Sequence, residues 1–371
     1  MIFKNKGEWN ELYVCFKFLA DGKMYNADAY GVKTGEYLEI TKIFREDDEG
    51  VKTYIRDVDN NVVKIYLNGN LEKEIDFDVF ENMANCLFVN LKLARKRPEI
   101  QDLLAQNPSN KQGFPIPEVE TFMSEILMTT VSQSAAHKAD IEFEIKDVHT
   151  GSQNRVAYSI KSNFKSSKAT LINASEATNF VYKLHSMNDI HMDNINSINT
   201  TNKIIDRIQY MRDNVIQMEF RTTYRPLAKQ NLRRVDSLLP EIISELLKIH
   251  YITGKTSVKE VVELLTQKDP FSFQDDYVYI YKFKKFLTAC SLGLDIGKTW
   301  NGLEEATGGM IIVQDNGEII AFHLYDRNLF EEFLFNSVKF ERASTGRHKF
   351  ASVYKVDNNY FFNLNLQIRY F

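Results

Sequence analysis

Hydrophobic positions change their spacing along the chain, and each spacing predicts a different kind of element. Near the N-terminus, large apolar side chains recur every three or four residues between Trp9 and Leu19, which predicts an amphipathic helix over 7–20. From about 36 to 77 the spacing falls to two, interrupted by Asp-Asn-Asn and Asn-Gly-Asn turns. That alternation predicts an antiparallel β-meander. Longer helical patterns follow at 79–96 and 118–133.

The second half of the chain is mostly helical in pattern and then returns to β character. Helices are predicted at 201–218, 238–250 and 276–291, with Ser257 as the N-cap of a further helix. The last 70 or so residues alternate again around Asp-Asn-Gly and Asp-Asn-Asn turns. The sequence therefore predicts a mixed α/β (α+β) protein, with a Pro-rich connection at 107–117 as its clearest internal boundary.

Composition narrows the class of protein. The chain has 371 residues, 44% hydrophobic and 26% charged, which are values of a globular protein. It has no apolar run of the ~18 residues that span a bilayer and no signal-peptide core, so we expect no membrane association. The three cysteines are odd in number and far apart, which predicts reduced thiols and a cytoplasmic location.

The net charge of the chain limits which nucleic-acid partners are expected. The 46 Lys and Arg against 50 Asp and Glu give −4, which does not indicate a nucleic-acid coat protein. The same balance is compatible with an enzyme that acts on DNA, because carboxylates that hold metal ions add negative charge.

A charged hairpin is predicted between residues 140 and 161. Carboxylates alternate with apolar residues in DIEFEIKD, and a second alternating run, VAYSIK, ends at Lys161. If Thr150-Gly151 forms a two-residue turn, Asp140 lies opposite Lys161, and Glu142 lies opposite Ser159 on the same face.

Two carboxylates and a lysine on one face suit metal-dependent hydrolysis of phosphodiesters. Oxygen ligands hold Mg²⁺, the ion polarises the phosphate and acidifies its water, and a lysine can orient that water. On alternation alone, an ordinary amphipathic hairpin with a surface ion pair is the simpler interpretation, since such pairs are common.

Resemblance to a known family favours the catalytic interpretation. Ala139-Asp140 and Ser159-Ile160-Lys161 resemble the two halves of the PD-(D/E)xK nuclease motif. Most of the chain resembles the HpaII-type family of type II restriction endonucleases. The segments that carry this resemblance are, in order, KGEWNELYVCFKFLADGKMYNAD, DIEFEIKDVHTG, YSIKSNFKSSKATLINASEATNFVYK, TGGMIIV, FERASTGRHKF and LNLQIRYF.

The resemblance implies Mg²⁺-dependent cleavage of double-stranded DNA at a CCGG-type target, with a cognate methyltransferase that protects the host. It assigns Asp140 to the metal and Lys161 to the attacking water, within a PD-(D/E)xK core near 118–185. The predicted segments are 1–110 (helix, meander and long helix), 111–200 (catalytic core) and 201–371 (DNA recognition). Cleavage at a palindrome favours a homodimer, or a monomer that nicks each strand in turn.

The third metal ligand has three candidates, because Ser159 replaces the usual second acid of the motif. Glu176 follows Lys161 by 15 residues in a helix predicted near Ala174. Glu142 lies opposite Ser159 in the predicted register. Glu11 belongs to a Lys-Gly-x-x-x-Glu pattern that resembles an N-terminal helix glutamate of related nucleases.

Contacts with DNA are expected from basic segments at 203–234 and 342–371 and from the loop after Lys161. For Arg207, a helix-surface pair with neighbouring Asp206 is the simpler interpretation. Arg347 could read guanine in the major groove. The residues predicted to contact DNA are Lys165, Lys168, Arg233, Arg234, Ser344, Arg347 and His348.

Two other function classes remain open at the level of sequence. A DNA- or RNA-binding protein could keep this fold without cutting, for which Ser159 is the best argument. A structure-specific or RNA nuclease could use the same site. Cleavage that depends on Mg²⁺ would distinguish a restriction endonuclease from the non-cleaving binding protein. A discrete, sequence-defined pattern of DNA fragments would distinguish it from the structure-specific or RNA nuclease.

Overall fold

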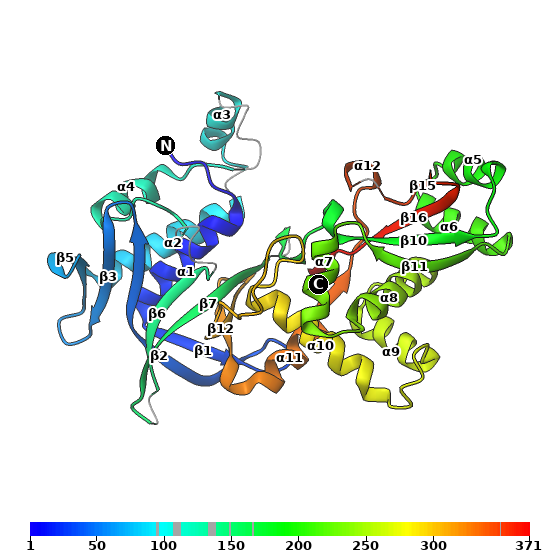
Figure 1. Cartoon of the computed structure of the whole chain (residues 1–371). Helices are drawn as coiled ribbons and strands as arrows, with labels where there is room; N and C mark the ends of the chain where they lie inside the picture. The colour runs from blue at the N-terminus through cyan, green and yellow to red at the C-terminus, as the bar shows by residue number, and fades with distance from the viewer. Residues whose placement is uncertain (94–95, 107–112, 133–138, 148–149, 165–166, 349) are drawn as a thin grey trace. The chain divides into compact units, whose positions relative to one another are not determined.

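The computed structural model describes residues 1–93, 96–106, 113–132, 139–147, 150–164, 167–348 and 350–371 (Figure 1). The chain forms two compact units. The first contains Met1–Ser167 and Glu305–Leu329, and the second contains Lys168–Glu304 and Phe330–Phe371. Both units combine helices with strands, so the predicted mixed α/β class is confirmed. No helix within the described ranges is both long and apolar enough to cross a bilayer.

The first unit is a large mixed sheet covered by helices. Its helices are α1 (Lys6–Asp21), α2 (Phe77–Leu93), α3 (Pro98–Gln106), α4 (Pro117–Glu125) and the 3₁₀ turn η3 (Leu324–Asp326). Its strands are β1 (Lys23–Ala27), β2 (Lys33–Asp47), β3 (Gly50–Asp57), β4 (Val62–Leu67), β5 (Asn70–Asp76), β6 (Ile141–Lys146), β7 (Gln153–Phe164), β12 (Gly309–Gln314) and β13 (Ile319–His323). They follow the order β1-β13-β12-β7-β6-β2-β3-β4-β5, and the short β8 (Ser167–Lys168) pairs with β7.

The sheet also closes on itself. Tyr25 of β1 pairs in parallel with Ile320 of β13 and antiparallel with Tyr37 of β2. The pairings β1-β13-β12-β7-β6-β2-β1 therefore form a ring of six strands, and β3, β4 and β5 extend it as the predicted meander.

Helix α1 supplies much of the core of this unit. Asn5 caps its start by accepting from the backbone N–H of Gly7 and Glu8, and the Glu8 side chain accepts from the Asn5 N–H, which completes a capping box. Gly22 ends the helix in the left-handed conformation, with φ +68°. The apolar stripe that predicted the helix, Trp9 to Leu19, is buried between α2 and the sheet (Figure 1).

The predicted segments 1–110 and 111–200 do not separate in the structure. Strand β6 pairs with β2 of the meander, so both segments contribute to one sheet. Residues 305–329, from the predicted third segment, add β12 and β13 to the same sheet. Residues 107–112 of the Pro-rich connection lie outside the described residues.

The second unit holds two small sheets and most of the helices. Its sheets have the orders β11-β10-β16-β15 and β14-β17-β9. The strands are β9 (Thr170–Ile172), β10 (Asn179–His185), β11 (Gln217–Thr223), β14 (Val338–Phe340), β15 (Val353–Val356), β16 (Asn359–Asn365) and β17 (Ile368–Tyr370). The helices are η2 (Glu176–Thr178), α5 (Asp189–Ser197), α6 (Lys203–Asp213), α7 (Pro226–Val235), α8 (Leu239–Thr253), α9 (Val258–Lys268), α10 (Asp276–Leu292), α11 (Arg327–Ser337, which starts in the first unit) and α12 (Thr345–His348).

Two predicted helices are shorter than the sequence pattern suggested. The helix expected over 201–218 ends at Asp213, because Val215 adopts a left-handed φ of +58° and the chain continues into β11. The helix expected over 118–133 ends at Glu125, and Leu127 has φ +61°. The Ser257 cap and the helix at 276–291 are confirmed.

Close packing of β12 against β13 gives a test of the fold. Gly309 has φ +132°, and a Cβ atom there would lie 2.0 Å from the Phe322 carbonyl oxygen. We expect Gly309→Ala to lower the free energy of unfolding by about 2 kcal/mol or more, since it combines backbone strain with a clash. Urea denaturation followed by circular dichroism measures the change.

Gly35→Ala is the matched control, because a Cβ at Gly35 meets nothing within 4 Å. It should change the free energy of unfolding by less than about 0.5 kcal/mol. Equal stability of the two variants would contradict the strain assigned to Gly309.

Candidate active site

The charged hairpin predicted from the sequence is present as β6 and β7. The two strands pair antiparallel, with Ile141 opposite Tyr158 and Lys146 opposite Gln153. The predicted partners of Asp140 and Glu142 are wrong, because Glu142 lies opposite Ala157 rather than Ser159.

The cause of this register difference is the loop between the strands. The Asp147 N–H donates to the Ser152 carbonyl and the Gly151 N–H donates to the Asp147 carbonyl, so the connection is longer than a two-residue turn. The shift is two residues, which keeps every side chain on its predicted face.

Asp140, Ser159 and Lys161 form one chain of contacts at the end of this hairpin. Oδ2 of Asp140 accepts from the Ser159 hydroxyl at 3.2 Å and from the Ile160 N–H at 2.5 Å. The Lys161 ammonium donates to the Ser159 hydroxyl at 2.7 Å and lies 3.8 Å from Oδ2 of Asp140. The Asp140 and Lys161 side chains are each 25% exposed, so this cluster is neither a freely solvated ion pair nor a buried one.

Parallel pairing with β12 fixes the other edge of β7. Met310 lies beside Ser159 and Ile312 lies beside Lys161 in this ladder. Strand β7 is thus held on both edges, which leaves its side chains little freedom to move relative to Asp140.

Glu11 of α1 lies in the same electrostatic environment. Burial, and after it the Asp140 charge, raise the pKa of its carboxyl to about 8, although the Ser132 hydroxyl, Lys161 and Arg45 act in the opposite direction. Glu11 is thus a candidate for the third ligand whose carboxyl interacts with both Asp140 and Lys161.

Arg45 is a component of this region that the sequence analysis missed. It is only 6% exposed, and its guanidinium donates to the carbonyl oxygens of Thr130 and Val131, each at 2.9 Å. Its charge also acts on Glu11. The sequence could have indicated this burial, because Arg45 follows Ile43 by two residues in β2 and therefore lies on the same face as that buried side chain.

Glu142 forms an ion pair with another residue of the hairpin. Its two carboxylate oxygens accept from Arg155 at 2.5 and 2.9 Å, a bidentate pair, and the same guanidinium lies over the Phe44 ring. The neighbouring Glu144 is paired with Lys42 and Thr41.

Glu176 belongs to the second unit. It begins η2, a single 3₁₀ turn of three residues rather than the predicted longer helix. Together with Arg225 and Lys298 it lines a cavity of about 740 Å³ within that unit.

The donor atoms near Asp140 are those that Mg²⁺ prefers. In the described part of the chain, no three His, Cys, Asp or Glu side chains are close enough together to hold a metal ion. Mg²⁺ commonly uses one or two carboxylates and keeps several waters, so the Asp140 and Glu11 pair fits it. Oδ1 of Asp140 accepts no hydrogen bond from the described residues, which leaves that atom available.

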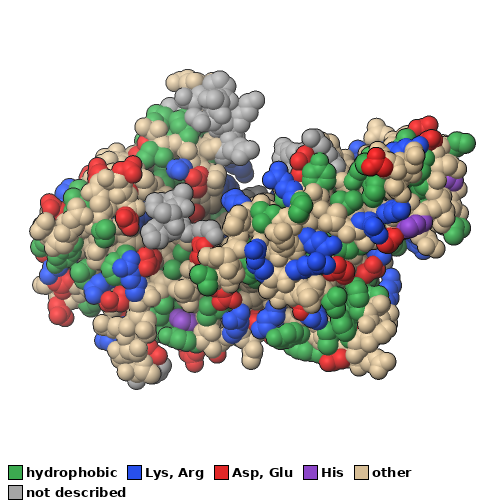
Figure 2. Space-filling model, viewed as in Figure 1, with side chains coloured by type: hydrophobic (Ala, Val, Ile, Leu, Met, Phe, Trp, Pro, Cys, Tyr) green, Lys and Arg blue, Asp and Glu red, His purple; other side chains and the backbone are tan. Residues whose placement is uncertain are grey.

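The residues predicted to contact DNA are dispersed. Lys168 lies in β8, and Lys165 is outside the described residues. Arg233 and Arg234 end α7, where Arg233 pairs with Glu241 at 3.5 Å and Arg234 donates to Asn231. Lys and Arg side chains gather over α7 and β11 (Figure 2).

The predicted recognition loop surrounds the short helix α12. Ser344 precedes this helix and lines a cavity of about 240 Å³. The backbones of Arg347 and His348 lie in α12, but their side chains are outside the described part of the structure.

Comparison with known proteins covers almost the entire chain. The HpaII restriction endonuclease family matches residues 5–370. The chain is 32% identical over 370 residues to the type II restriction enzyme HpaII of Haemophilus parainfluenzae, covering 99% of this chain and 98% of that enzyme. No solved structure gives a significant match. The match over the full length, with the Asp140–Ser159–Lys161 cluster inside it, shows that the chain belongs to the HpaII restriction endonuclease family.

Proposed function

We propose that this protein hydrolyses phosphodiester bonds in double-stranded DNA at a short palindromic, CCGG-type site, and that it needs Mg²⁺ to do so. The contact chain from Asp140 through Ser159 to Lys161 carries the proposal, because it joins a metal-binding carboxylate to an ammonium group in one rigid hairpin. Membership of the restriction endonuclease family supports double-stranded DNA as the substrate. The β6–β7 hairpin and its flanking elements then serve as a PD-(D/E)xK core.

In this proposal Asp140 and Glu11 hold the metal ion. When bound, Mg²⁺ would supply charge neutralisation at the scissile phosphate and a more acidic water. Glu11 comes from α1 rather than from β7, so it can provide the negative charge that Ser159 lacks.

Lys161 and Ser159 have distinct roles. The ammonium of Lys161 orients the attacking water and stabilises the charge that develops on the phosphate. The Ser159 hydroxyl donates to Asp140 and accepts from Lys161, so it sets the direction of both side chains without adding charge. Ser159 is 8% exposed, so its hydroxyl is largely shielded from water, whereas the Asp140 and Lys161 side chains remain partly exposed.

Several partners follow from this function. We propose a cognate DNA methyltransferase that modifies the same target, and cleavage of both strands either by a homodimer or by one subunit in two steps. We also propose a cytoplasmic location, since Cys15, Cys86 and Cys290 are all free thiols.

Digestion of an unmethylated plasmid of known sequence tests the reaction. With Mg²⁺ we expect discrete fragments that end at CCGG-containing sites, and with a chelator intact plasmid. Lys161→Ala should slow cleavage by at least about 100-fold, because the water and the phosphate lose their cation. Lys146→Ala, at the opposite end of β6, should cut normally.

The alternatives predict other fragment patterns. Plasmid that stays intact with folded protein would support a binding protein without catalysis. Cleavage without sequence preference, or of RNA, would support a structure-specific nuclease or ribonuclease.

Single-atom substitutions identify the third ligand. Asp140→Asn and Glu11→Gln should each reduce cleavage by about 100-fold or more and abolish the rise in melting temperature that Mg²⁺ produces in the native enzyme. Glu142→Gln should do neither, because that carboxylate is paired with Arg155. Glu176→Gln should also leave the Mg²⁺ response intact. Loss of the response in Glu176→Gln but not in Glu11→Gln would move the assignment to Glu176.

The raised pKa of Glu11 predicts a pH dependence. Below its pKa of about 8 the carboxyl holds a proton that Mg²⁺ must displace, so the apparent affinity for Mg²⁺ should rise about tenfold per pH unit up to that value. Without metal, a raised pKa contributes stability at low pH that is lost as the pH rises from about 4.5 to about 8.

Magnesium titrations and melting curves in chelator, at pH 6 to 9, measure both effects. Without metal, the melting temperature of Glu11→Gln should change less with pH over that range than the melting temperature of the native protein. If the variant kept the pH dependence of the native protein, another group would have to be responsible.

A further inference from the structure

A groove in the second unit joins the two basic segments of the sequence. Two cavities, of about 510 and 240 Å³, share Lys203 and Thr345 and so adjoin one another. We call this the α6–α12 groove. Six of the residues that line it are Lys203, Tyr224, Arg342, Ser344, Thr345 and Tyr354.

Arg207 makes the base of the groove rigid. Its guanidinium donates to the carbonyl of Ala351 and to the Ser352 hydroxyl, which tie α6 to the segment after α12. It also donates to the carbonyls of Asn196 and Ile198, at 3.0 and 2.9 Å. The predicted helix-surface pair with Asp206 is therefore wrong: Arg207 is buried, and its guanidinium donates to carbonyl groups and to the Ser352 hydroxyl.

Within the part of the chain that the structure describes, the cations of the groove lack acidic partners. Lys203 is half-buried and Arg342 is exposed, and neither forms an ion pair within the described residues. The neighbouring acids are engaged elsewhere: Asp206 accepts from the Thr200 hydroxyl, and Glu341 pairs with Arg369 at 2.5 Å. Among the described residues, the groove therefore presents two positive charges without an acidic partner, and an external anion can neutralise them.

The remaining walls carry hydroxyl groups and aromatic rings. Ser344 and Thr345 line the groove beside the cations, and such hydroxyls are common donors to phosphate oxygens. Tyr224 is 50% exposed, whereas the Tyr354 hydroxyl donates to Asn363 at 3.0 Å. Tyr354 is thus fixed as part of the wall, and Tyr224 remains free to contact a ligand.

We propose that the α6–α12 groove binds the phosphodiester backbone of DNA, with Lys203 and Arg342 each neutralising one phosphate. This proposal rests on the proposed nuclease function and adds a DNA-contact surface in the unit that does not carry Asp140 and Lys161. The smaller cavity brings together Lys203 and Arg342, which belong to the two basic segments 203–234 and 342–371.

Binding measured in a Lys161→Ala background tests this groove. Fluorescence anisotropy with a duplex containing the target and a duplex lacking it gives the affinity over a series of salt concentrations. We expect Lys203→Ala/Arg342→Ala to weaken binding of both duplexes by about 10-fold or more and to reduce the salt slope by about 2, one for each lost phosphate contact. Lys203→Gln/Arg342→Gln, which keeps more side-chain volume, should behave in the same way.

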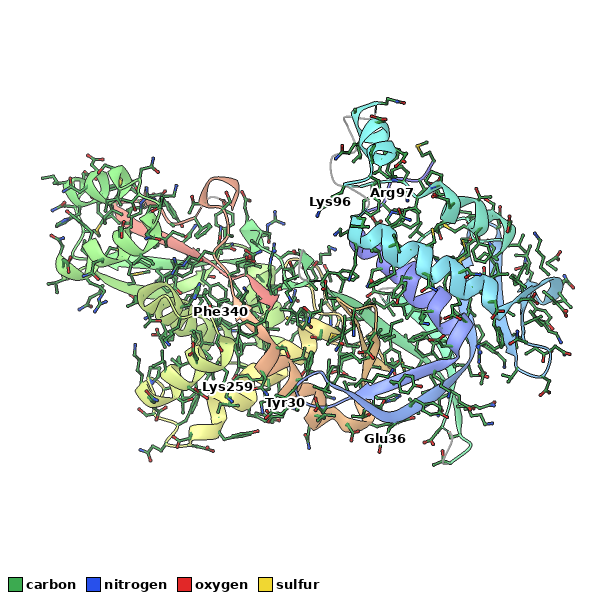
Figure 3. The ribbon with its side chains drawn as sticks, turned by 180° about the vertical axis from the view of Figure 1, so that it is seen from behind. Tyr30, Glu36, Lys96, Arg97, Lys259 and Phe340 are labelled. Carbon is green, nitrogen blue, oxygen red and sulfur yellow. The ribbon has the colours of Figure 1, made fainter. Side chains whose placement is uncertain are left out.

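The control removes two exposed lysines from α9 of the same unit. Lys259 (Figure 3) and Lys268 do not line the groove, so Lys259→Ala/Lys268→Ala should keep the native affinity and salt slope. This control separates the loss of two specific contacts from a general change in net charge.

Three results would overturn the proposal. One is an unchanged affinity and salt slope in the folded groove variants. Another is a loss confined to the target duplex, which would indicate base reading instead of phosphate contact. A third is displacement of DNA by inorganic phosphate at matched ionic strength, which would indicate a site for small anions. The nuclease function would survive each of these, whereas it fails separately if the native enzyme does not cut.

Discussion

The site depends on how strand β7 is held. The strand pairs antiparallel with β6 on one edge and parallel with β12 on the other, so its backbone hydrogen bonds are committed on both sides. Ser159 and Lys161 are two residues apart in β7, so they stand on the same face of the strand, opposite to Tyr158 and Ile160. Asp140 accepts from the Ile160 N–H, so even the carboxylate is positioned by the backbone of this strand. Few degrees of freedom remain between the three functional groups.

Charge balance explains why acidic and basic groups can share a largely enclosed region. Lys161 and Arg45 bring two positive charges near Asp140, and Glu11 adds a second negative charge there only when it loses its proton, which the raised pKa of about 8 resists. A buried charge is costly unless it is paired, and removing one member leaves the others uncompensated. Serine at position 159 fits this balance, because a third carboxylate beside Asp140 would raise the repulsion that already acts on Glu11.

Much of this arrangement was readable from the sequence, although its details were not. Spacing of two predicted the hairpin and the correct face for Asp140 and Lys161, because parity survives a register shift of two residues. The register itself depended on hydrogen bonds made by Asp147 in the loop, which turn statistics do not supply. Arg45 was missed because an arginine among several charged residues of a strand suggests a surface position, although its parity with Ile43 places it on the buried face. Strand β11 was missed because the helical spacing of apolar residues continues beyond Val215, so the predicted helix over 201–218 included the start of the strand.

The closed ring of strands has a consequence for the newly made protein. Strands β12 and β13 complete the sheet around β7, yet residues 168–304 of the second unit lie between them and β7 in the sequence. A nascent chain that stops before Gly309 contains Asp140, Ser159 and Lys161 but has no strand on the second edge of β7. Contacts between such distant segments form late, since they require closure of a very long loop. The topology therefore delays assembly of the site until β12 and β13 have been synthesised, which suits a nuclease whose premature activity would damage the DNA of its own cell.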